Sequence, residues 1–185
     1  MPAISLKKGE RLSLAKAAGS TLNKVLLGLG WDITPGAGQV DLDASVATFD
    51  ASGNEIEVVY FGNKSSRNGS ITHSGDNLTG AGDGDDEQIV VDLSKVPDAV
   101  QSIFCTVTSY RGQKLNVVKN AYVRVVNTAD NSEVCRYSLS EGQPTTGIII
   151  ARIYRHQGEW KIAALGEFAN GNTVKALNSS MKALL

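Results

Sequence analysis

Short apolar segments separated by turn-forming residues run along most of this chain of 185 residues. In several segments apolar and polar residues alternate, as at Val40, Leu42 and Ala44, which places alternate side chains on opposite faces of a strand. Residues 148–150 are apolar throughout, which is typical of a strand buried on both faces. The pattern predicts strands at 25–31, 40–49, 55–62, 88–93, 102–110, 121–127, 133–139, 147–157 and 159–168.

Turn residues predict three hairpins, at 50–54, 130–132 and 157–158, because Gly, Asn and Asp adopt turn conformations at little steric cost. Strands joined in this way favour an all-β fold, an antiparallel β-sandwich. The sequence shows no repeat and no linker, so we expect a single domain over residues 1–185.

The spacing of the apolar residues changes near the C-terminus. Residues 173–185 are predicted to form a short amphipathic helix, with Asn172 or Thr173 as its N-cap. We expect the helix to pack on its own sheet; the alternative is a helix that binds a membrane surface or a partner, and Lys175 and Lys182 alone charge its polar face. Its apolar residues recur at three- and four-residue steps: Val174, Leu177, Met181, Leu184 and Leu185.

Composition is that of an ordinary globular protein, with 42% hydrophobic and 20% charged residues. Cys105 and Cys135 lie in apolar runs, so we expect buried free thiols in a reducing compartment. No stretch approaches the roughly 20 apolar residues of a membrane span, and residues 1–8 lack the apolar segment of a signal peptide. These features predict a cytoplasmic protein with no integral membrane segment, for which any membrane contact is peripheral.

Charge is distributed unevenly. Residues 25–94 hold 12 acidic and two basic side chains, whereas the rest of the chain holds 16 basic and seven acidic ones. The acidic part attracts cations and argues against nucleic acid as a partner. The basic residues are scattered singly, which is typical of solvated strand faces more than of a phosphate-binding patch.

The densest acidic segment is residues 74–87, which is rich in glycine. Two carboxylates about 4 Å apart repel each other by roughly 4 kcal/mol at an effective dielectric constant near 20, so a bound cation is the most economical way to hold several together. The available donors are oxygens, including the Asn77 amide and the Thr79 hydroxyl, and they favour calcium over magnesium and disfavour zinc. The segment does not follow the EF-hand spacing. Its carboxylates are Asp76, Asp83, Asp85, Asp86 and Glu87.

A second acidic group precedes this segment. In a strand, Asp41 and Asp43 point to the same face, so both can reach one ion; the alternative is a solvent-facing pair. Together with Asp32 and the segment 74–87 they supply enough donors for two calcium ions that share bridging carboxylates.

Signals for catalysis are weaker. His73 and His156 lie in different parts of the chain, and no nucleophile motif or phosphate-binding loop occurs. The Gly-Leu-Gly run at 28–30 lacks the third glycine of a dinucleotide site. We expect instead a strand end whose glycines admit close approach of another backbone, with Trp31 in the core.

Several segments carry a family resemblance. Residues 25–32 read Val-Leu-Leu-Gly-Leu-Gly-Trp-Asp, residues 41–45 read Asp-Leu-Asp-Ala-Ser, and residues 75–88 read Gly-Asp-Asn-Leu-Thr-Gly-Ala-Gly-Asp-Gly-Asp-Asp-Glu-Gln. The third match continues to Pro97, and with further matching segments at 4–9, 120–127, 153–156 and 159–161 the sequence resembles the TerD-like family of tellurium-resistance and general stress proteins.

The resemblance implies a calcium-binding β-sandwich without established catalytic activity, with two Ca²⁺ held in acidic loops at one end. It also implies a place among other stress-response proteins, in a cytoplasmic or membrane-peripheral complex. We therefore expect a non-enzymatic protein in which bound calcium orders a docking surface. The alternatives are a calcium-dependent phospholipid-binding module and a metal-dependent hydrolase. The ligands that the resemblance supports are Asp32, Asp41, Asp43, Asp76, Asn77, Asp83, Asp85, Asp86 and Glu87.

Overall fold

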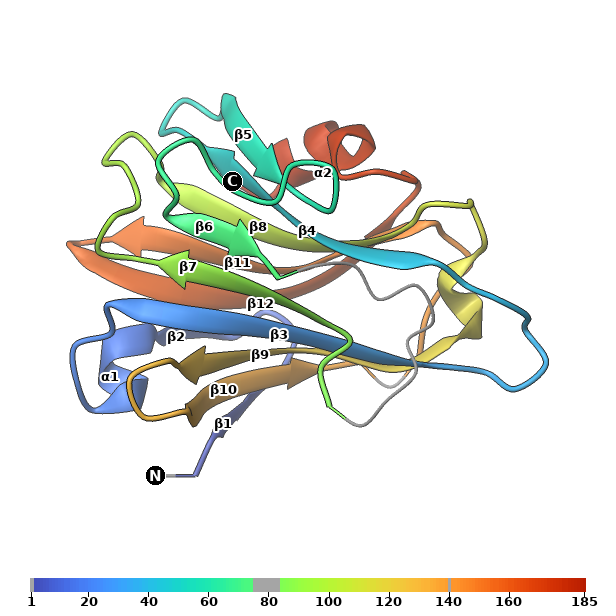
Figure 1. The fold of residues 1–185 in the computed structure, drawn as a ribbon, viewed down its shortest axis with the longest axis horizontal. Coiled ribbons are helices and arrows are strands. Elements are labelled where there is room, and N and C mark those ends of the chain that lie inside the picture. Colours follow the sequence, from blue (N-terminus) through green and yellow to red (C-terminus); the bar gives the residue numbers. More distant parts are fainter. Residues whose placement is uncertain (1, 75–83, 140) are drawn as a thin grey trace.

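A computed structural model describes residues 2–74, 84–139 and 141–185. Its strands form two six-stranded sheets that pack face to face (Figure 1). Neighbouring strands are antiparallel except for the outermost pair of the first sheet, β1 and β10, which is parallel. The first sheet has the order β1 (Ile4–Leu6), β10 (Ser132–Ser138), β9 (Val118–Asn127), β3 (Lys24–Ile33), β7 (Glu87–Asp92) and β6 (Ile71–His73). The second has the order β2 (Arg11–Ser13), β12 (Glu159–Ala169), β11 (Gly147–His156), β8 (Ser102–Ser109), β4 (Leu42–Phe49) and β5 (Glu55–Val59).

The nine strands predicted from the sequence are all present, with shifted ends, and the three predicted hairpins join β4 to β5, β9 to β10 and β11 to β12. The sequence pattern missed the three short strands β1, β2 and β6. Each has three residues, which is too short to show a period of two. The predicted strand at 40–49 begins only at Leu42, so Asp41 lies before it.

The main core lies between the two sheets. Leu27 of β3 and Ile103 of β8 are fully buried there, and Trp31 is 5% exposed, which confirms its predicted core position. Cys105 and Cys135 are free and buried, as expected, and burial raises the pKa of each thiol to about 12.

A smaller core covers the outer face of the second sheet. Residues after β12 form the 3₁₀ helix η2 (Lys175–Leu177) and the short helix α2 (Asn178–Lys182), a shorter helix than the predicted 173–185. Val174, Leu177 and Met181 are buried against the sheet, which confirms packing on the chain's own sheet (Figure 1). The facing sheet residues include Phe49, Phe104 and Ile149.

Two further helical turns connect strands. Helix α1 (Leu14–Ala18), which the sequence pattern did not predict, is capped by the Ser13 hydroxyl and ends at Gly19 with a φ of 66°. The 3₁₀ helix η1 (Leu115–Val117) precedes β9. Among the helices of the described residues, none is both long enough and apolar enough to span a bilayer.

Candidate functional site

Acidic residues from both sheets meet at one end of the sandwich. The end of β3 lies beside the start of β7, because Leu29 pairs with Glu87. The start of β4, in the other sheet, is joined to them because Ala44 N–H donates to Glu87 Oε2 at 2.6 Å. The topology therefore brings together segments that lie far apart in the sequence.

Glu87 and His73 form a buried pair that holds β4. His73 Nε2 lies 3.0 Å from the Ala44 carbonyl oxygen and 3.1 Å from Glu87 Oε2. Both partners are acceptors, so Nε2 carries the proton. β5 pairs with β4 only from Val46 onward, so Ala44 has no β5 partner. The Glu87 carboxylate and the His73 ring instead satisfy the backbone N–H and C=O of Ala44. The histidine thus has a structural position, and Glu87 has a buried structural contact.

Asp86 lies among other carboxylates. Its Oδ2 accepts a hydrogen bond of 2.7 Å from Trp31 N–H. Burial raises the pKa of Asp86 to about 6, and the charges of Asp32, Glu87 and Asp85 act in the same direction. Its ionised form is therefore disfavoured by its surroundings, which is the electrostatic situation that a divalent cation relieves.

Asp85 has a different environment. Its side chain is fully buried and makes a bidentate contact with Arg124, at 2.8 Å from Nε and 2.7 Å from Nη2. Tyr122 Oη and Gln88 Nε2 also donate to it, at 2.9 and 3.0 Å. Burial alone would raise the pKa of Asp85, but these donors hold it below its usual value. The carboxylate is thus charged and saturated by protein donors.

The glycines of β3 make room for this contact. A Cβ atom at Gly28 would lie 2.5 Å from Asp85 Oδ1, and one at Gly30 would lie 2.5 Å from Tyr122 Oη. The expected close approach is therefore real, but the approaching groups are side chains and not a backbone. Only glycine lets a carboxylate and an aromatic ring lie flat on the strand.

The contact continues across the outer face of β9 and β10. Arg124 also reaches Glu133 Oε2 at 3.3 Å, and Glu133 accepts from Arg136 Nε at 2.8 Å. The Arg136 guanidinium lies over the Tyr122 ring at 4.2 Å from its centroid. The scattered basic residues predict a solvated strand face, whereas the structure pairs Arg124 and Arg136 with carboxylates. The available signal was the pair of small residues on β3, which requires a large group above it.

The other predicted ligands that the structure describes are Asp32, Asp41 and Asp43, at the ends of β3 and β4. Asp32 accepts from Asn120 Nδ2 at 2.9 Å, and Asp43 is 5% exposed on β4. Asp41 faces Arg111 at 3.7 Å through Oδ2, while its Oδ1 is buried without a hydrogen-bond partner in the described residues. A buried carboxylate oxygen of this kind suits a hard cation.

The predicted ligands Asp76, Asn77 and Asp83 lie outside the described residues. Within the described ranges, no group of three or more His, Cys, Asp or Glu side chains is placed to hold a metal ion. The structure therefore brings Asp86 near Asp32 and Glu87 without completing a coordination shell, and the ligand set stays a prediction.

Two solved structures share the two-sheet fold of this chain. The fold matches a homologue of telluride resistance protein (TerD) from Streptomyces coelicolor A3(2), with a TM-score of 0.70, 22% identity and coverage of 88% of this chain and 98% of that one. A protein of unknown function, SAV2460, matches with a TM-score of 0.69, 23% identity and coverage of 87% and 97%. These matches confirm the two-sheet fold.

Sequence comparisons show the family. Residues 2–180 match the TerD domain. The tellurium resistance protein TerD of Serratia marcescens is 43% identical over 178 residues, covering 91% of this chain and 92% of that protein. General stress protein 16U of Bacillus subtilis is 42% identical over 182 residues, with coverage of 93% and 94%. The chain therefore belongs to the TerD family of tellurium-resistance and stress-response proteins, as the sequence motifs predicted.

Proposed function

We propose that the chain binds calcium at the acidic end of the sandwich and acts by binding rather than by catalysis. The observation that carries the proposal is the placement of Asp86, half-buried and beside Asp32 and Glu87, with a pKa raised to about 6. A cation that binds there removes the repulsion which otherwise opposes ionisation. The buried Oδ1 of Asp41 supports a second position for a hard cation at the same end.

The carboxylates divide into two roles under this proposal. Asp85 and Glu87 hold the framework, because Asp85 is saturated by donors of β7 and β9 and Glu87 secures β4. The proposed ligands are the other predicted residues: Asp32, Asp41, Asp43, Asp76, Asn77, Asp83 and Asp86. With calcium bound, these groups supply charge-neutralising oxygen contacts that tie the acidic segment to the ends of β3 and β4.

The proposed consequence is ordering of a docking surface. A ligand that binds only the folded state stabilises it by about 2.7 kcal/mol at a hundredfold excess over its dissociation constant. Such stabilisation at one end of the sandwich would present that end to other stress-response proteins, in a cytoplasmic or membrane-peripheral complex. The names of the relatives, which describe resistance and stress response, support a place for this chain in a stress response.

A calcium titration by calorimetry on chelator-stripped protein, with millimolar magnesium present, tests the proposal. We expect about two ions per chain and a loss of affinity of at least tenfold in Asp86→Asn. The matched control is Asp98→Asn, because Asp98 is exposed and contacts the rest of the chain through its carbonyl oxygen. Unchanged affinity in Asp86→Asn, or an equal loss in the control, would refute the proposed site.

A further inference from the structure

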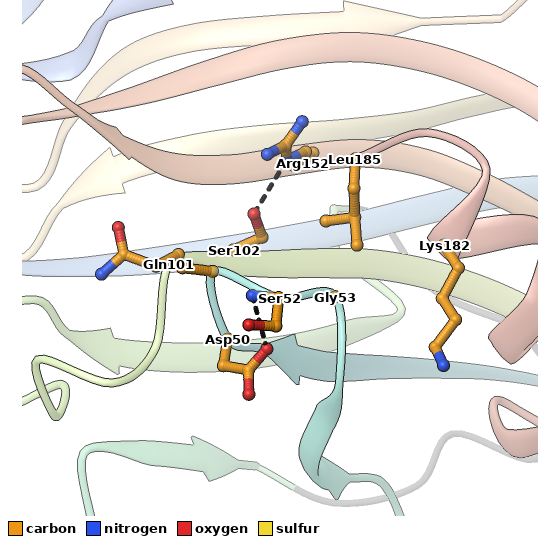
Figure 2. Close-up of a pocket in the computed structure, with 9 residues that line it drawn as sticks. Asp50, Ser52, Gly53, Gln101, Ser102, Arg152, Lys182 and Leu185 are labelled. Carbon is orange, nitrogen blue, oxygen red and sulfur yellow. Dashed lines mark hydrogen bonds between the residues drawn. The ribbon is translucent and has the colours of Figure 1, made fainter.

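A cleft lies on the second sheet at the far end of β4 from the acidic residues (Figure 2). It is bordered by the β4–β5 turn, the start of β8 and helix α2, and its volume is about 470 Å³, within the roughly 300–1,000 Å³ range of small-molecule sites. Polar and charged side chains line much of it, so it suits a hydrophilic ligand. The lining side chains used below are Asp50, Ser52, Ser102, Arg152 and Lys182.

Arg152 is fixed in the wall of this cleft. Its Nε donates to Ser102 Oγ at 3.0 Å, and its Nη1 donates to the Leu184 carbonyl oxygen at 3.2 Å (Figure 2 draws the first of these). The guanidinium also lies over the Tyr154 ring, 4.8 Å from its centroid, and over Phe104 at 5.7 Å. These contacts hold the charge in one place and therefore reduce the entropy that a ligand must overcome.

This guanidinium differs from Arg124 and Arg136 but resembles Arg155, which is also partly buried and contacts only carbonyl oxygens and the Trp160 ring in the described residues. Arg124 and Arg136 each contact a carboxylate, and hydrogen bonds to Asp85 and Glu133, respectively, raise their pKa values. Arg152 contacts no carboxylate in the part of the chain that is described, its Nη2 makes no hydrogen bond there, and burial lowers its pKa. A half-buried guanidinium without a carboxylate contact is costly, and an anionic ligand would offset that cost.

Two further charged side chains line the cleft beside Arg152. Lys182 of α2 adds a second cation. Asp50 adds one negative charge, but Oδ1 accepts from the backbone N–H groups of Ser52 and Asn54, and Oδ2 accepts from Asn54 Nδ2. The acid thus stabilises its own turn, and the Ser52 and Ser102 side chains add hydroxyl groups to the lining.

We propose that this cleft binds a small molecule that carries a phosphate group, which Arg152 contacts through its open Nη2 edge and Lys182 neutralises from the facing helix. A phosphate offers three terminal oxygens and up to two charges, so the guanidinium, the ammonium and a serine hydroxyl can each take one oxygen. A carboxylate offers fewer acceptors for this donor set. The site is separate from the proposed calcium site and does not depend on it.

The test uses the full chain in the presence of EDTA, so that calcium binding does not contribute. Inorganic phosphate and glycerol 3-phosphate are titrated, with acetate as the carboxylate probe and vesicles of anionic phospholipid as the membrane probe. Backbone amide shifts of Ser52 and Gly53 and calorimetry report binding. We expect saturable binding of both phosphate probes with a dissociation constant of about 1 mM or lower, equivalent to about −4 kcal/mol.

Variants locate the site. Ser52→Glu should abolish binding, because it places a negative charge in the wall of the cleft. The turn should keep its structure, because Ser52 contributes its backbone N–H and not its hydroxyl to it. Lys182→Gln should weaken binding about fivefold, the loss of about 1 kcal/mol. Arg152→Gln should also abolish binding. If Arg152→Gln fails to fold, the loss of binding in Ser52→Glu tests the proposal. Lys175→Gln is the matched control, because Lys175 lies on the same C-terminal segment but not in the cleft.

Tighter binding of glycerol 3-phosphate than of inorganic phosphate would support a larger phosphorylated ligand, and equal binding would support recognition of the phosphate group alone. The proposal would be overturned by acetate binding as tightly as phosphate, by binding to vesicles only, by no saturable shift at Ser52 and Gly53, or by an effect of Lys175→Gln as large as that of Ser52→Glu.

Discussion

The contact between Gly28 and Asp85 gives the sharpest stability prediction. Replacing Gly28 by Ala puts a methyl group where the Asp85 carboxylate lies, because the added Cβ would be 2.5 Å from Oδ1. The Gly28 backbone is not in the left-handed region, so it accepts alanine without strain of its own. The carboxylate must therefore move, and it leaves Arg124, Tyr122 and Gln88 together.

The cost follows from the burial of the two charges. Breaking a buried ion pair costs about 3–5 kcal/mol. Arg124 is 28% exposed and keeps Glu133 at 3.3 Å, which reduces the loss to about 2–3 kcal/mol. Alanine also lowers the conformational entropy of the unfolded chain relative to glycine, which offsets about 0.4–1 kcal/mol of this loss. We expect Gly28→Ala to lower the free energy of unfolding by about 2 kcal/mol, or the melting temperature by roughly 4–8 °C.

Urea unfolding in EDTA, followed by tryptophan fluorescence, measures this loss, and a double-mutant cycle with Asp85→Ala identifies its cause. Once Asp85 is shortened, the methyl group at Gly28 meets no carboxylate, so Gly28→Ala should cost less than about 0.5 kcal/mol in that background. An equal cost in both backgrounds would show that the loss does not arise from Asp85 and would refute the reasoning.

Two further predictions concern the acidic end. The pKa of Asp86 in the folded protein, about 6, is above its unfolded value, so the calcium-free wild type should lose stability as pH rises from about 4 to 6. Asp86→Asn should therefore be more stable than the wild type by about 1–2 kcal/mol at pH 7. Urea unfolding at pH 4 and pH 7 should show this gain at pH 7 alone. His73→Ala removes the donor to Ala44 and Glu87 and should lower the free energy of unfolding by about 2–3 kcal/mol. His73→Gln should restore part of this stability. A loss below about 0.5 kcal/mol in the same unfolding assay would contradict the structural role of His73.

The strand content of this protein was readable because alternation is a local property. Most long strands carry their own period of two or a continuous apolar run, so these nine strands could be placed within a few residues. The three-residue strands were not readable because their pairing partners, and not their sequences, make them strands. The helix predicted at 173–185 is shorter because its apolar stripe turns onto the sheet through a 3₁₀ segment first.

The sequence by itself determined that this chain is an all-β member of the TerD family with an acidic segment between two strands. Only the tertiary structure decided what individual acids do, because their partners lie far away in the chain. Arg124, which saturates Asp85, is 39 residues away, and Ala44, which Glu87 secures, is 43 residues away. A carboxylate is a candidate ligand in any acidic sequence, but its charge is available to a cation only where the fold brings it no stronger donor.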